Sequence, residues 1–290
     1  MSNVKITKDM VIIENLEHFD PVHVFECGQC FRWNKENNNS YTGVAFGKVI
    51  NVSMLDHRLI IKNTTEEDYY TIWEDYFDLK RDYKAIKNEL SKDDEIMKQA
   101  IDFGKGIRLL NQNEWETVIS FIISQNKSIP IIKQNIEALS RQYGRYLGNY
   151  WGKDYYDFPS PEKLAGISVD DILACKVGYR AKYIKKTACE IAKSDHLYHL
   201  KYGSDEEAEA YLLGLHGIGP KVANCIMLFS LNKYQRFPID VWVERVMKEL
   251  YQLKDTKSIT QYVDKTFQSY GGFAQQYLFY YAREKKIGKK

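Results

Sequence analysis

The sequence predicts an α+β protein in which an antiparallel β-sheet region precedes an all-helical region. Between residues 11 and 65, β-branched and aromatic residues alternate with polar ones, which is the period of a half-buried strand. From Gly104 onward the alternation stops, and apolar residues recur at the spacing of amphipathic helices. We therefore expect two domains: an antiparallel β-sheet domain with flanking helices at 1–104, and a helical domain at 105–290.

The first domain shows its strands and helices through local patterns. The clearest strands are Tyr41–Phe46, Val49–Val52 and Leu59–Ile61, the last of which follows a turn at Asp56 and His57. The acidic start Thr65–Asp68 and the spacing of Tyr83, Ile86 and Leu90 predict helices between residues 66 and 103. A further helix is expected to begin at the cap formed by Ser91–Glu95.

The second domain shows helical spacing throughout. Apolar residues recur in this way at Trp115-Val118-Ile119-Ile122, Ile132-Ile136-Leu139, Ala188-Ile191 and Leu212-Leu213. Turns between these helices are marked by Gly144, Gly148, Phe158–Pro161, Gly178, Gly203, Gly217–Gly219 and Phe237-Pro238.

Composition excludes several classes of protein. A chain of 290 residues, with 44% hydrophobic and 28% charged residues, can bury one large core or two modest ones. The first apolar run, Val11–Ile13, is too short for a signal sequence or a membrane span, so the expected location is cytoplasmic, beside the nucleoid in a prokaryote, or nuclear in a eukaryote. Five cysteines are an odd number in a long chain, which favours reduced thiols.

The charge balance gives little guidance. A net charge of +2 is nearly neutral, so any binding of phosphates must come from local clusters rather than from the overall field. Short basic clusters occur at Arg180–Lys186 and in the tail Arg283–Lys290. For the tail, the favoured interpretation is a solvated and frayed end of the chain.

The most informative segment is Leu212–Cys225, where one helix ends, Gly217 and Gly219 bracket an apolar residue, and another helix begins. This arrangement presents backbone N–H groups at a helix N-terminus without obstructing side chains, which suits an anion such as a phosphate. A simple turn between helices is the alternative interpretation of the two glycines alone.

Lys221 falls in the first turn of the second helix of this segment. The positive end of the helix dipole disfavours an ammonium there, so we expect a lowered pKa and a more nucleophilic amine. The alternative is an ordinary solvated surface lysine.

Asp240 stands in Phe237–Val246, where a helix-capping carboxylate is expected after Pro238. Capping alone would account for it. Beside Lys221, the same carboxylate could also stabilise positive charge at a reacting carbon and assist proton transfer.

These segments resemble a known family. The hairpin Gly217–Lys221 followed by Phe237–Val241 is similar to the helix-hairpin-helix-GPD glycosylase superfamily, and Cys27–Trp33 resembles the opening signature of the 8-oxoguanine DNA glycosylase family. Further matching segments run in the family's order at Phe121–Asn126, Gly178–Tyr183 and Gly272–Phe279. The resemblance implies a TBP-like antiparallel β-sheet domain followed by an all-α helix-hairpin-helix glycosylase bundle.

The resemblance also implies an activity. The protein is expected to be a base-excision-repair DNA glycosylase that flips out and excises 8-oxoguanine and related oxidised purines from duplex DNA. The catalytic residues would be Lys221, which attacks C1′, and Asp240, with an associated β-elimination AP lyase step that passes through a Schiff base. No catalytic metal or organic cofactor is implied, although a structural monovalent cation could sit at the hairpin. The expected partner is double-stranded DNA and not a membrane, and the expected state is a monomer.

Four residues are implied to hold the flipped base. Gly28 would offer its carbonyl to the N7–H that 8-oxoguanine has and guanine lacks. Phe279 would stack on one face of the base, Cys225 would lie toward the other face, and Gln275 would bind the Watson–Crick edge. The alternatives are core packing for Phe279, and for Cys225 either a small core residue or a thiolate paired with the Lys221 ammonium.

Other residues are implied to bind the DNA around the lesion. Asn126 would fill the space left by the flipped nucleotide, while Tyr179 and Arg180 would contact bases from the same side. The remaining DNA-binding residues expected by resemblance are His216, Gly217, Gly219, Val222 and Trp242.

Neighbouring residues have simpler interpretations. Gln29, Phe31 and Trp33 alternate as on a strand and are expected to support the site. Cys27 and Cys30 have the spacing of a zinc knuckle but lack a second ligand pair, so we do not expect a metal there.

The sequence departs from the family pattern at two places. Trp242 stands where animal members usually carry histidine, and Pro130-Ile131 replaces the region of a second arginine that grips the opposite cytosine. We therefore expect a relaxed preference for the opposite base. The C-terminal region also lacks the four-cysteine cluster of the iron–sulfur relatives.

Two other functions are compatible with parts of the pattern. One is a non-catalytic hairpin module that binds duplex DNA through its phosphates, with Lys221 as a phosphate contact. The other is a monofunctional alkyl-purine glycosylase that uses Asp240 and water and has no need of Lys221 or Gly28.

Overall fold

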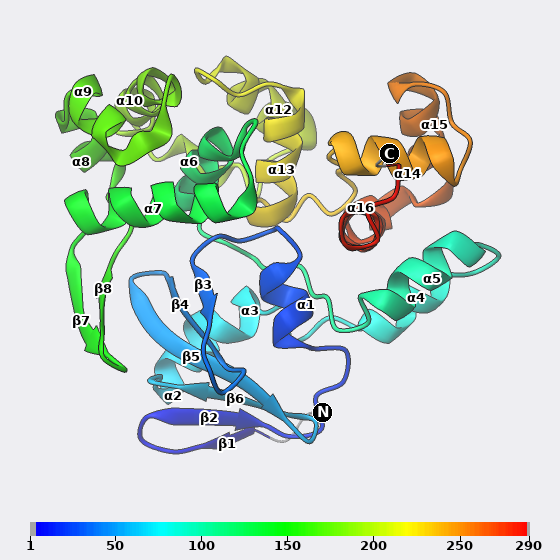
Figure 1. Cartoon of the computed structure of the whole chain (residues 1–290), viewed down its shortest axis with the longest axis horizontal. Helices are drawn as coiled ribbons and strands as arrows, with labels where there is room; N and C mark the ends of the chain where they lie inside the picture. The colour runs from blue at the N-terminus through cyan, green and yellow to red at the C-terminus, as the bar shows by residue number, and fades with distance from the viewer. Residues whose placement is uncertain (1–3, 289–290) are drawn as a thin grey trace.

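The computed structural model describes residues 4–288 and places a β-sheet beside a larger body of helices (Figure 1). The sheet has six strands in the order β1-β2-β6-β5-β4-β3, and every neighbouring pair is antiparallel. Its strands are β1 (Val4–Ile6), β2 (Met10–Ile13), β3 (Trp33–Lys35), β4 (Tyr41–Ala45), β5 (Lys48–Leu55) and β6 (Arg58–Lys62). The α+β prediction, with the sheet first, is confirmed.

The sheet follows from the alternation seen in the sequence. Val11 and Ile13 on β2 lie opposite Ile61 and Leu59 on β6, and all four side chains are buried on one face. That face is covered by α1 (Pro21–Glu26), whose N-terminus is capped by Asp20, and by the segment α2 (Glu66–Asp68), η1 (Tyr69–Trp73) and α3 (Glu74–Tyr76). An aromatic cluster therefore fills this smaller core.

The remaining helices form the larger core. They are α4 (Tyr83–Leu90), α5 (Glu95–Phe103), α6 (Glu114–Ser124), α7 (Ile129–Tyr143), α8 (Pro161–Gly166), α9 (Val169–Ile172), α10 (Arg180–Ile191), α11 (His196–His199), α12 (Asp205–Gly214), α13 (Pro220–Ser230), α14 (Val241–Glu249), α15 (Thr256–Thr266) and α16 (Gly271–Glu284). A π-helical turn, η2 (Leu173–Val177), precedes α10, and a 3₁₀ turn, η3 (Gln268–Tyr270), precedes α16. Within residues 4–288, no helix is both long and apolar enough to cross a membrane.

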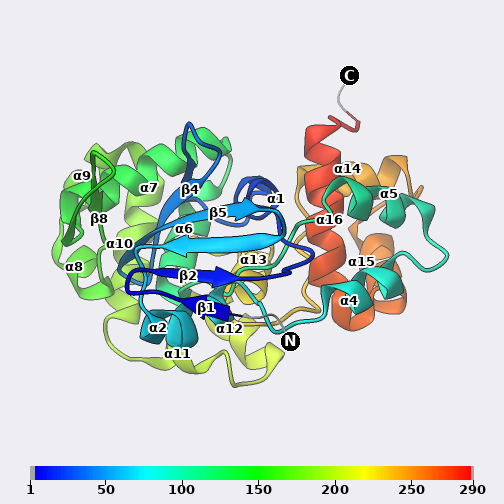
Figure 2. The ribbon, with the colours of Figure 1, turned by 90° about the horizontal axis from the view of Figure 1, so that it is seen from below.

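The two cores separate earlier in the chain than residue 104. Side chains of α4 and α5 belong to the helical core, whereas the sheet core is built from residues 11–77 and Leu110. Figure 2 shows α5 lying alongside α16, from the other end of the chain. Helices at 83–103 were expected to flank the sheet, but their apolar faces pack against α16, which lies more than 160 residues later in the sequence.

A second departure lies in the helical domain, where no strand was expected. The hairpin β7 (Tyr146–Tyr150) and β8 (Lys153–Tyr156) extends from α7 toward the sheet (Figure 1). Its Lys153 forms an ion pair with Glu36 of the first domain, at 2.9 Å between Nζ and Oε2. Most of its side chains are exposed or half-buried, so the hydrophobic alternation that marks a buried strand is weak here.

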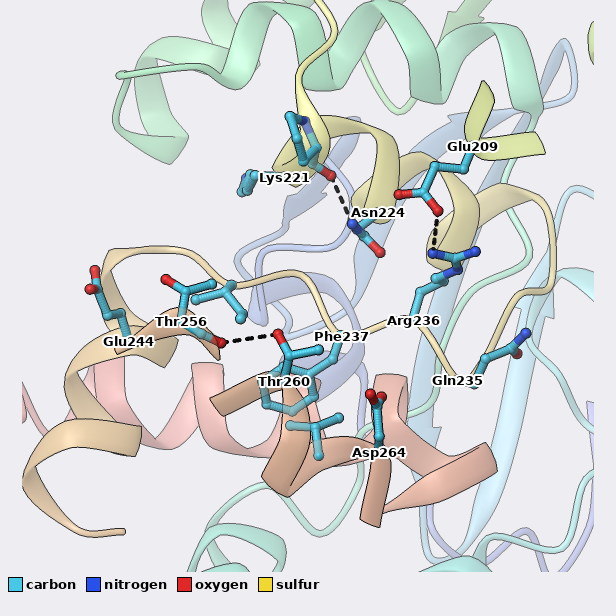
Figure 3. A pocket seen from close by; sticks show the side chains of 13 residues that line it. Glu209, Lys221, Asn224, Gln235, Arg236, Phe237, Glu244, Thr256, Thr260 and Asp264 are labelled. Carbon is cyan, nitrogen blue, oxygen red and sulfur yellow. Dashed lines mark hydrogen bonds and ion pairs between the residues drawn. The ribbon is translucent and has the colours of Figure 1, made fainter. Parts of the chain in front are cut away.

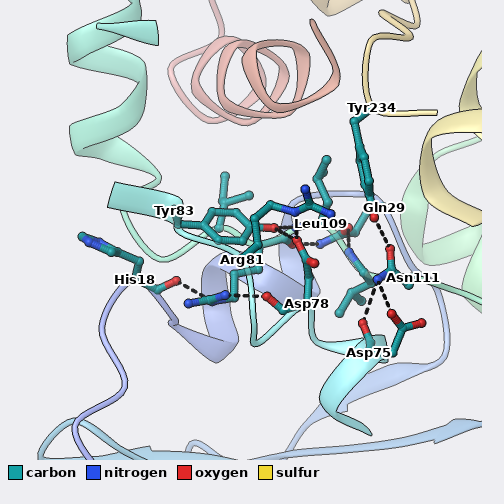
Figure 4. Close-up of polar contacts among 12 residues, drawn as sticks. His18, Gln29, Asp75, Asp78, Arg81, Tyr83, Leu109, Asn111 and Tyr234 are labelled. Carbon is teal, nitrogen blue, oxygen red and sulfur yellow. Dashed lines mark hydrogen bonds and ion pairs between the residues drawn. The ribbon is translucent and has the colours of Figure 1, made fainter. Parts of the chain in front are cut away.

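The segment between α5 and α6 joins the two domains through a buried polar network (Figure 4). The Arg108 guanidinium donates to the carbonyls of His18 and Asp78, at 3.0 and 2.7 Å. The buried Gln29 side chain donates to the Arg108 carbonyl and accepts from the Leu110 amide, at 2.8 and 2.9 Å. These bonds fix the loop that follows α1 against the helical domain.

Candidate active site

The hairpin between α12 and α13 has the geometry that its two glycines predict. Gly217 has a φ of +82°, and a Cβ on it would lie 2.5 Å from the Tyr183 ring, so both backbone and packing require glycine. Its carbonyl accepts from Gln125 Nε2 at 2.9 Å. Gly219 occupies the N-cap of α13, followed by Pro220 at the first helical position. The first amides of α13 therefore face a surface that no side chain of residue 219 covers.

Three predicted residues meet at the N-termini of two helices. Lys221 lies in the first turn of α13, and Cys225 lies one turn later and is only 3% exposed. Asp240 is the N-cap of α14, where its Oδ1 accepts from the amides of Trp242 and Val243 at 3.0 and 2.9 Å. Lys221, Cys225 and Asp240 all line a small cavity of about 50 Å³.

The other walls of this site come from the N-terminal loop and from α16. Gly28 has a φ of +86°, and a Cβ on it would lie 2.8 Å from Cε1 of Phe279. Gly28, Phe279 and Gln275 border the small cavity, and Gly28 and Phe279 also border a larger, adjoining cavity of about 390 Å³ that contains Trp242. The structure thus brings together all six residues predicted to act on the base, from four separate segments of the chain.

The comparisons with known proteins agree with this geometry. Residues 11–118 match the family described as 8-oxoguanine DNA glycosylase, N-terminal domain, and residues 119–269 match the HhH-GPD superfamily of base excision DNA repair proteins. The chain belongs to the 8-oxoguanine DNA glycosylase family. The predicted resemblance is therefore confirmed.

Several relatives of this glycosylase family are similar over most of the chain. MBOgg1, solved in complex with a low-affinity DNA ligand, is 45% identical with a TM-score of 0.94 and 99% of each chain covered. The 8-oxoguanine glycosylase/lyase of Clostridium acetobutylicum, solved with double-stranded DNA containing cytosine opposite 8-oxoguanine, is 44% identical with a TM-score of 0.94, over 98% of this chain and 99% of that one. A probable N-glycosylase/DNA lyase of Methanothermobacter thermautotrophicus is 31% identical over 66% of this chain and 68% of the relative.

The electrostatics of Lys221 differ from the prediction. Its pKa is raised, first by the negative charge of Cys225 when ionised and further by Asp240, against the opposing effect of burial. Burial raises the pKa of the Cys225 thiol, and the Lys221 ammonium acts in the opposite direction. The expected lowering of the Lys221 pKa is not found, because Cys225 and Asp240 raise it more than burial lowers it. Lys221 must lose a proton before it can attack.

Asp240 is itself perturbed. Burial raises the pKa of its carboxyl group, while the amides of Val243 and Trp242, the Lys221 ammonium and Arg283 act in the opposite direction. Both predicted roles, the helix cap and the charge beside Lys221, fall on the same side chain.

A wide groove of about 760 Å³ runs past the catalytic pair. It joins three segments, namely residues 124–128 with Asn126 at a φ of +51°, the start of α13, and the start of α14 with Trp242. His216 and Gly219 are also exposed, as a DNA-contacting hairpin requires. The Val222 side chain is 4% exposed and packs in the core, so Val222 can reach DNA only through its amide.

Tyr179 and Arg180 have different environments. Tyr179 is 57% exposed, as expected of a residue that contacts DNA bases. Arg180 is 4% exposed, and its guanidinium donates to the carbonyls of Gln125 and Val177 while lying 4.3 Å from the Tyr179 ring centroid. In this conformation Arg180 positions Tyr179 and the turn before Asn126, instead of presenting its guanidinium to DNA as the sequence suggested.

Gln29, Phe31 and Trp33 support the site as expected, although they do not share a strand, since β3 begins only at Trp33. Gln29 is fully buried in the network of Figure 4, Trp33 stacks on Phe25 in the sheet core, and Phe31 lines the larger cavity. Within residues 4–288 there is no group of three or more His, Cys, Asp or Glu side chains that could hold a metal ion.

Sequence reasoning missed Arg283, which was assigned to a frayed tail. It lies in the last turn of α16, its side chain is 17% exposed, and it lines the larger cavity beside Phe279. The available signal was its spacing, because Gln275, Phe279 and Arg283 follow one another at four-residue intervals on a helix.

Behind the catalytic pair lies a further cavity of about 500 Å³ (Figure 3). On its wall Arg236 forms ion pairs with Asp205 and Glu209 of α12, each at 2.8 Å. These ion pairs hold the segment that leads into Asp240 against α12. They therefore help to position the Asp240 carboxylate relative to α13.

Proposed function

We propose that this protein excises 8-oxoguanine and related oxidised purines from duplex DNA and then cleaves the strand at the abasic site. The observation that carries this proposal is the meeting of Lys221 and Asp240 with a slot formed by Gly28 and Phe279. Membership of the 8-oxoguanine glycosylase family, and the glycosylase/lyase names of its relatives, support the same conclusion.

Recognition begins with extrusion of the damaged nucleotide, which costs a few kcal/mol of stacking and pairing. In the slot, the Gly28 carbonyl accepts a hydrogen bond from N7–H of 8-oxoguanine. Guanine has a lone pair at N7, which would leave the carbonyl facing another acceptor, so the normal base is disfavoured. Phe279 stacks on the base, Gln275 binds its Watson–Crick edge, and Cys225 lies toward the other face.

Excision then follows by nucleophilic displacement. Lys221 gives up its ammonium proton and its nitrogen bonds to C1′, while the bond from C1′ to the base breaks and the base leaves with its electron pair and a proton. Asp240 stabilises the positive charge that develops on the sugar. The bond from C1′ to the ring oxygen O4′ breaks next, as the nitrogen lone pair forms a double bond to C1′ and O4′ takes up a proton, which gives the Schiff base. Loss of a proton from C2′ of this Schiff base expels the 3′ phosphate, and water then releases the sugar from Lys221.

The groove beside the site would hold the rest of the duplex. Amides at the start of α13, which borders the groove, would donate hydrogen bonds to a phosphate, and Asn126 and Tyr179 would occupy the space around the extruded nucleotide. We propose that the protein is a monomer and acts at the nucleoid of a prokaryote or in the nucleus of a eukaryote. The proposed reaction requires neither a membrane nor an organic cofactor.

The monovalent cation proposed for the hairpin would have a structural role. The carbonyls of His216 and Gly217 already accept hydrogen bonds from Thr187 and Gln125, at 3.0 and 2.9 Å, and these donors would compete with a cation. The Leu215 carbonyl likewise accepts from the Ile218 amide at 3.4 Å, and no catalytic step depends on a cation.

The proposal is tested by single-turnover assays on a duplex with one 8-oxoguanine opposite cytosine, in which free base and cut strand are measured separately. The wild-type protein should release both products, and Lys221→Gln should release neither while it still binds the duplex. Base release without any strand cleavage, persisting in Lys221→Gln, would instead favour a monofunctional glycosylase that uses Asp240 and water. Binding alone in both proteins would favour a non-catalytic hairpin module.

A further inference from the structure

One face of α16 carries an ordered set of groups along the base slot. Gln275, Phe279 and Arg283 are spaced by four residues, so they lie on the same side of the helix, over a rise of about 12 Å from first to last. Gln275 Oε1 and Arg283 Nη1 are both buried, and neither atom has a hydrogen-bond partner among residues 4–288. Phe279, the stacking residue, stands between them.

Unpaired buried polar atoms are costly, so two of them on the wall of one site call for an explanation. Gln275 Oε1 is an acceptor, and the Watson–Crick edge of a guanine base presents the N1–H and N2–H donors that suit it. Arg283 Nη1 is a donor at the opposite end of the set. A base that satisfies both atoms must therefore carry an acceptor at the end away from its Watson–Crick edge.

The rest of the Arg283 guanidinium is held in place. Its Nη2 donates to the Glu26 carbonyl, its Nε donates to Glu284 at 2.9 Å, and its Cζ lies 5.4 Å from the Phe279 ring centroid. These contacts leave Nη1 as the remaining donor nitrogen. They also direct it toward Gly28, since a Cβ built on Gly28 would lie 3.2 Å from Nη1.

We propose that Arg283 is a specificity-determining residue whose Nη1 donates a hydrogen bond to O8 of the extruded 8-oxoguanine. This inference rests on the proposed function. Oxidation changes guanine at two neighbouring atoms, because N7 gains a hydrogen and C8 gains an oxygen. The Gly28 carbonyl accepts a hydrogen bond from the new N7–H, and Arg283 beside it donates one to the new oxygen at C8. Guanine offers C8–H there and leaves Nη1 unpaired.

Arg283 could instead act only as a clamp that holds the loop before Gly28 through the Glu26 carbonyl. The two roles predict different substrate dependence. A clamp affects every lesion that Gly28 recognises, whereas a donor to O8 affects only lesions with a good acceptor at C8. The pair 8-oxoguanine and 8-thioguanine separates the roles, because both carry N7–H but sulfur is a much weaker hydrogen-bond acceptor than oxygen.

The experiment measures single-turnover excision of both bases opposite cytosine by the wild-type protein, Arg283→Met and Arg283→Lys. Arg58→Met, at the start of β6, serves as the matched control for loss of an arginine. Strand cleavage at a pre-formed abasic site, where no base is present, reports whether each variant keeps a working fold and lyase.

For the wild-type protein we expect faster excision of 8-oxoguanine than of 8-thioguanine. Arg283→Met should lose about 10- to 100-fold on 8-oxoguanine, as for a hydrogen bond to a charged donor, with a much smaller loss on 8-thioguanine. Cleavage at the abasic site, where no base is present, should fall much less than excision of 8-oxoguanine. Arg283→Lys should fall between the two proteins, and Arg58→Met should match the wild type.

Equal losses on the two bases would overturn the proposal in favour of a clamp, and no loss on either would overturn it outright. If Arg283→Met also loses cleavage at the abasic site, the test uses Arg283→Lys and the ratio of its excision rates on 8-oxoguanine and 8-thioguanine. A ratio equal to that of the wild type would overturn the proposal, and a lower ratio would support it. A wild-type protein that leaves 8-oxoguanine in place would instead refute the proposed function.

Discussion

Replacing Gly28 with alanine perturbs the base slot at the point where the loop approaches α16 most closely. The new Cβ would stand 2.8 Å from Phe279 Cε1 and 3.2 Å from Arg283 Nη1, at a backbone φ of +86°. The left-handed backbone costs a residue with a Cβ about 1–2 kcal/mol, and forced overpacking costs about 1–3 kcal/mol. We therefore expect a free energy of unfolding lower by about 2–5 kcal/mol.

Two glycine variants divide this cost into its parts. Gly152→Ala, in the turn between β7 and β8, has a φ of +77° with no described atom within 4 Å of the new Cβ, so it should show the backbone cost alone. Gly166→Ala, at the end of α8, has neither problem and should be neutral or slightly stabilising.

The same variant should lose discrimination, since a displaced Gly28 carbonyl can no longer meet N7–H. Chemical denaturation measures the stability, and single-turnover excision of 8-oxoguanine measures the function. We expect a loss of about 10- to 100-fold in excision, with cleavage at a pre-formed abasic site much less affected. If Gly28→Ala matched Gly152→Ala in stability and the wild type in excision, the tight approach of the loop to Phe279 would be refuted.

Three further predictions follow from the site. Asp240→Asn keeps an oxygen that can cap α14 but removes the negative charge. The free energy of unfolding should therefore change by less than about 1 kcal/mol, while excision falls at least about 100-fold. An active variant would show that Asp240 acts only as a helix cap. Because the pKa of Lys221 is raised, the rate of Schiff-base formation should increase with pH as the ammonium loses its proton, and a flat or falling single-turnover profile would contradict this. With Trp242 and Pro130-Ile131 at the departures from the family pattern, excision opposite the four bases should differ by only about tenfold; activity confined to cytosine would count against the interpretation.

Local sequence signals predicted the parts of the site that depend on local geometry. The glycines of the hairpin, the proline at the first turn of α13 and the capping aspartate of α14 each have a physical reason within a few residues. The strands of the sheet were also visible, because one of their faces is buried and the alternation is therefore strong.

Features that depend on distant partners were not predictable in this way. Helices α4 and α5 join the helical core through α16, and Arg283 is held by Glu26, which lies 257 residues away in sequence. The burial of Arg180 beside the Tyr179 ring likewise depends on packing that the resemblance did not specify. The raised pKa of Lys221 likewise depends first on Cys225, one turn later on α13, and then on Asp240 from another helix, and a helix-dipole argument includes neither side chain.

The most direct test of the central claim is borohydride trapping on a duplex that contains one 8-oxoguanine opposite cytosine. The reductant converts a lysine Schiff base to a stable amine, so the wild-type protein should form a covalent protein–DNA adduct and Lys221→Gln should form none. An equal yield of adduct from both proteins would place the nucleophile elsewhere. No adduct from either, with binding to the duplex intact, would contradict catalysis by a lysine.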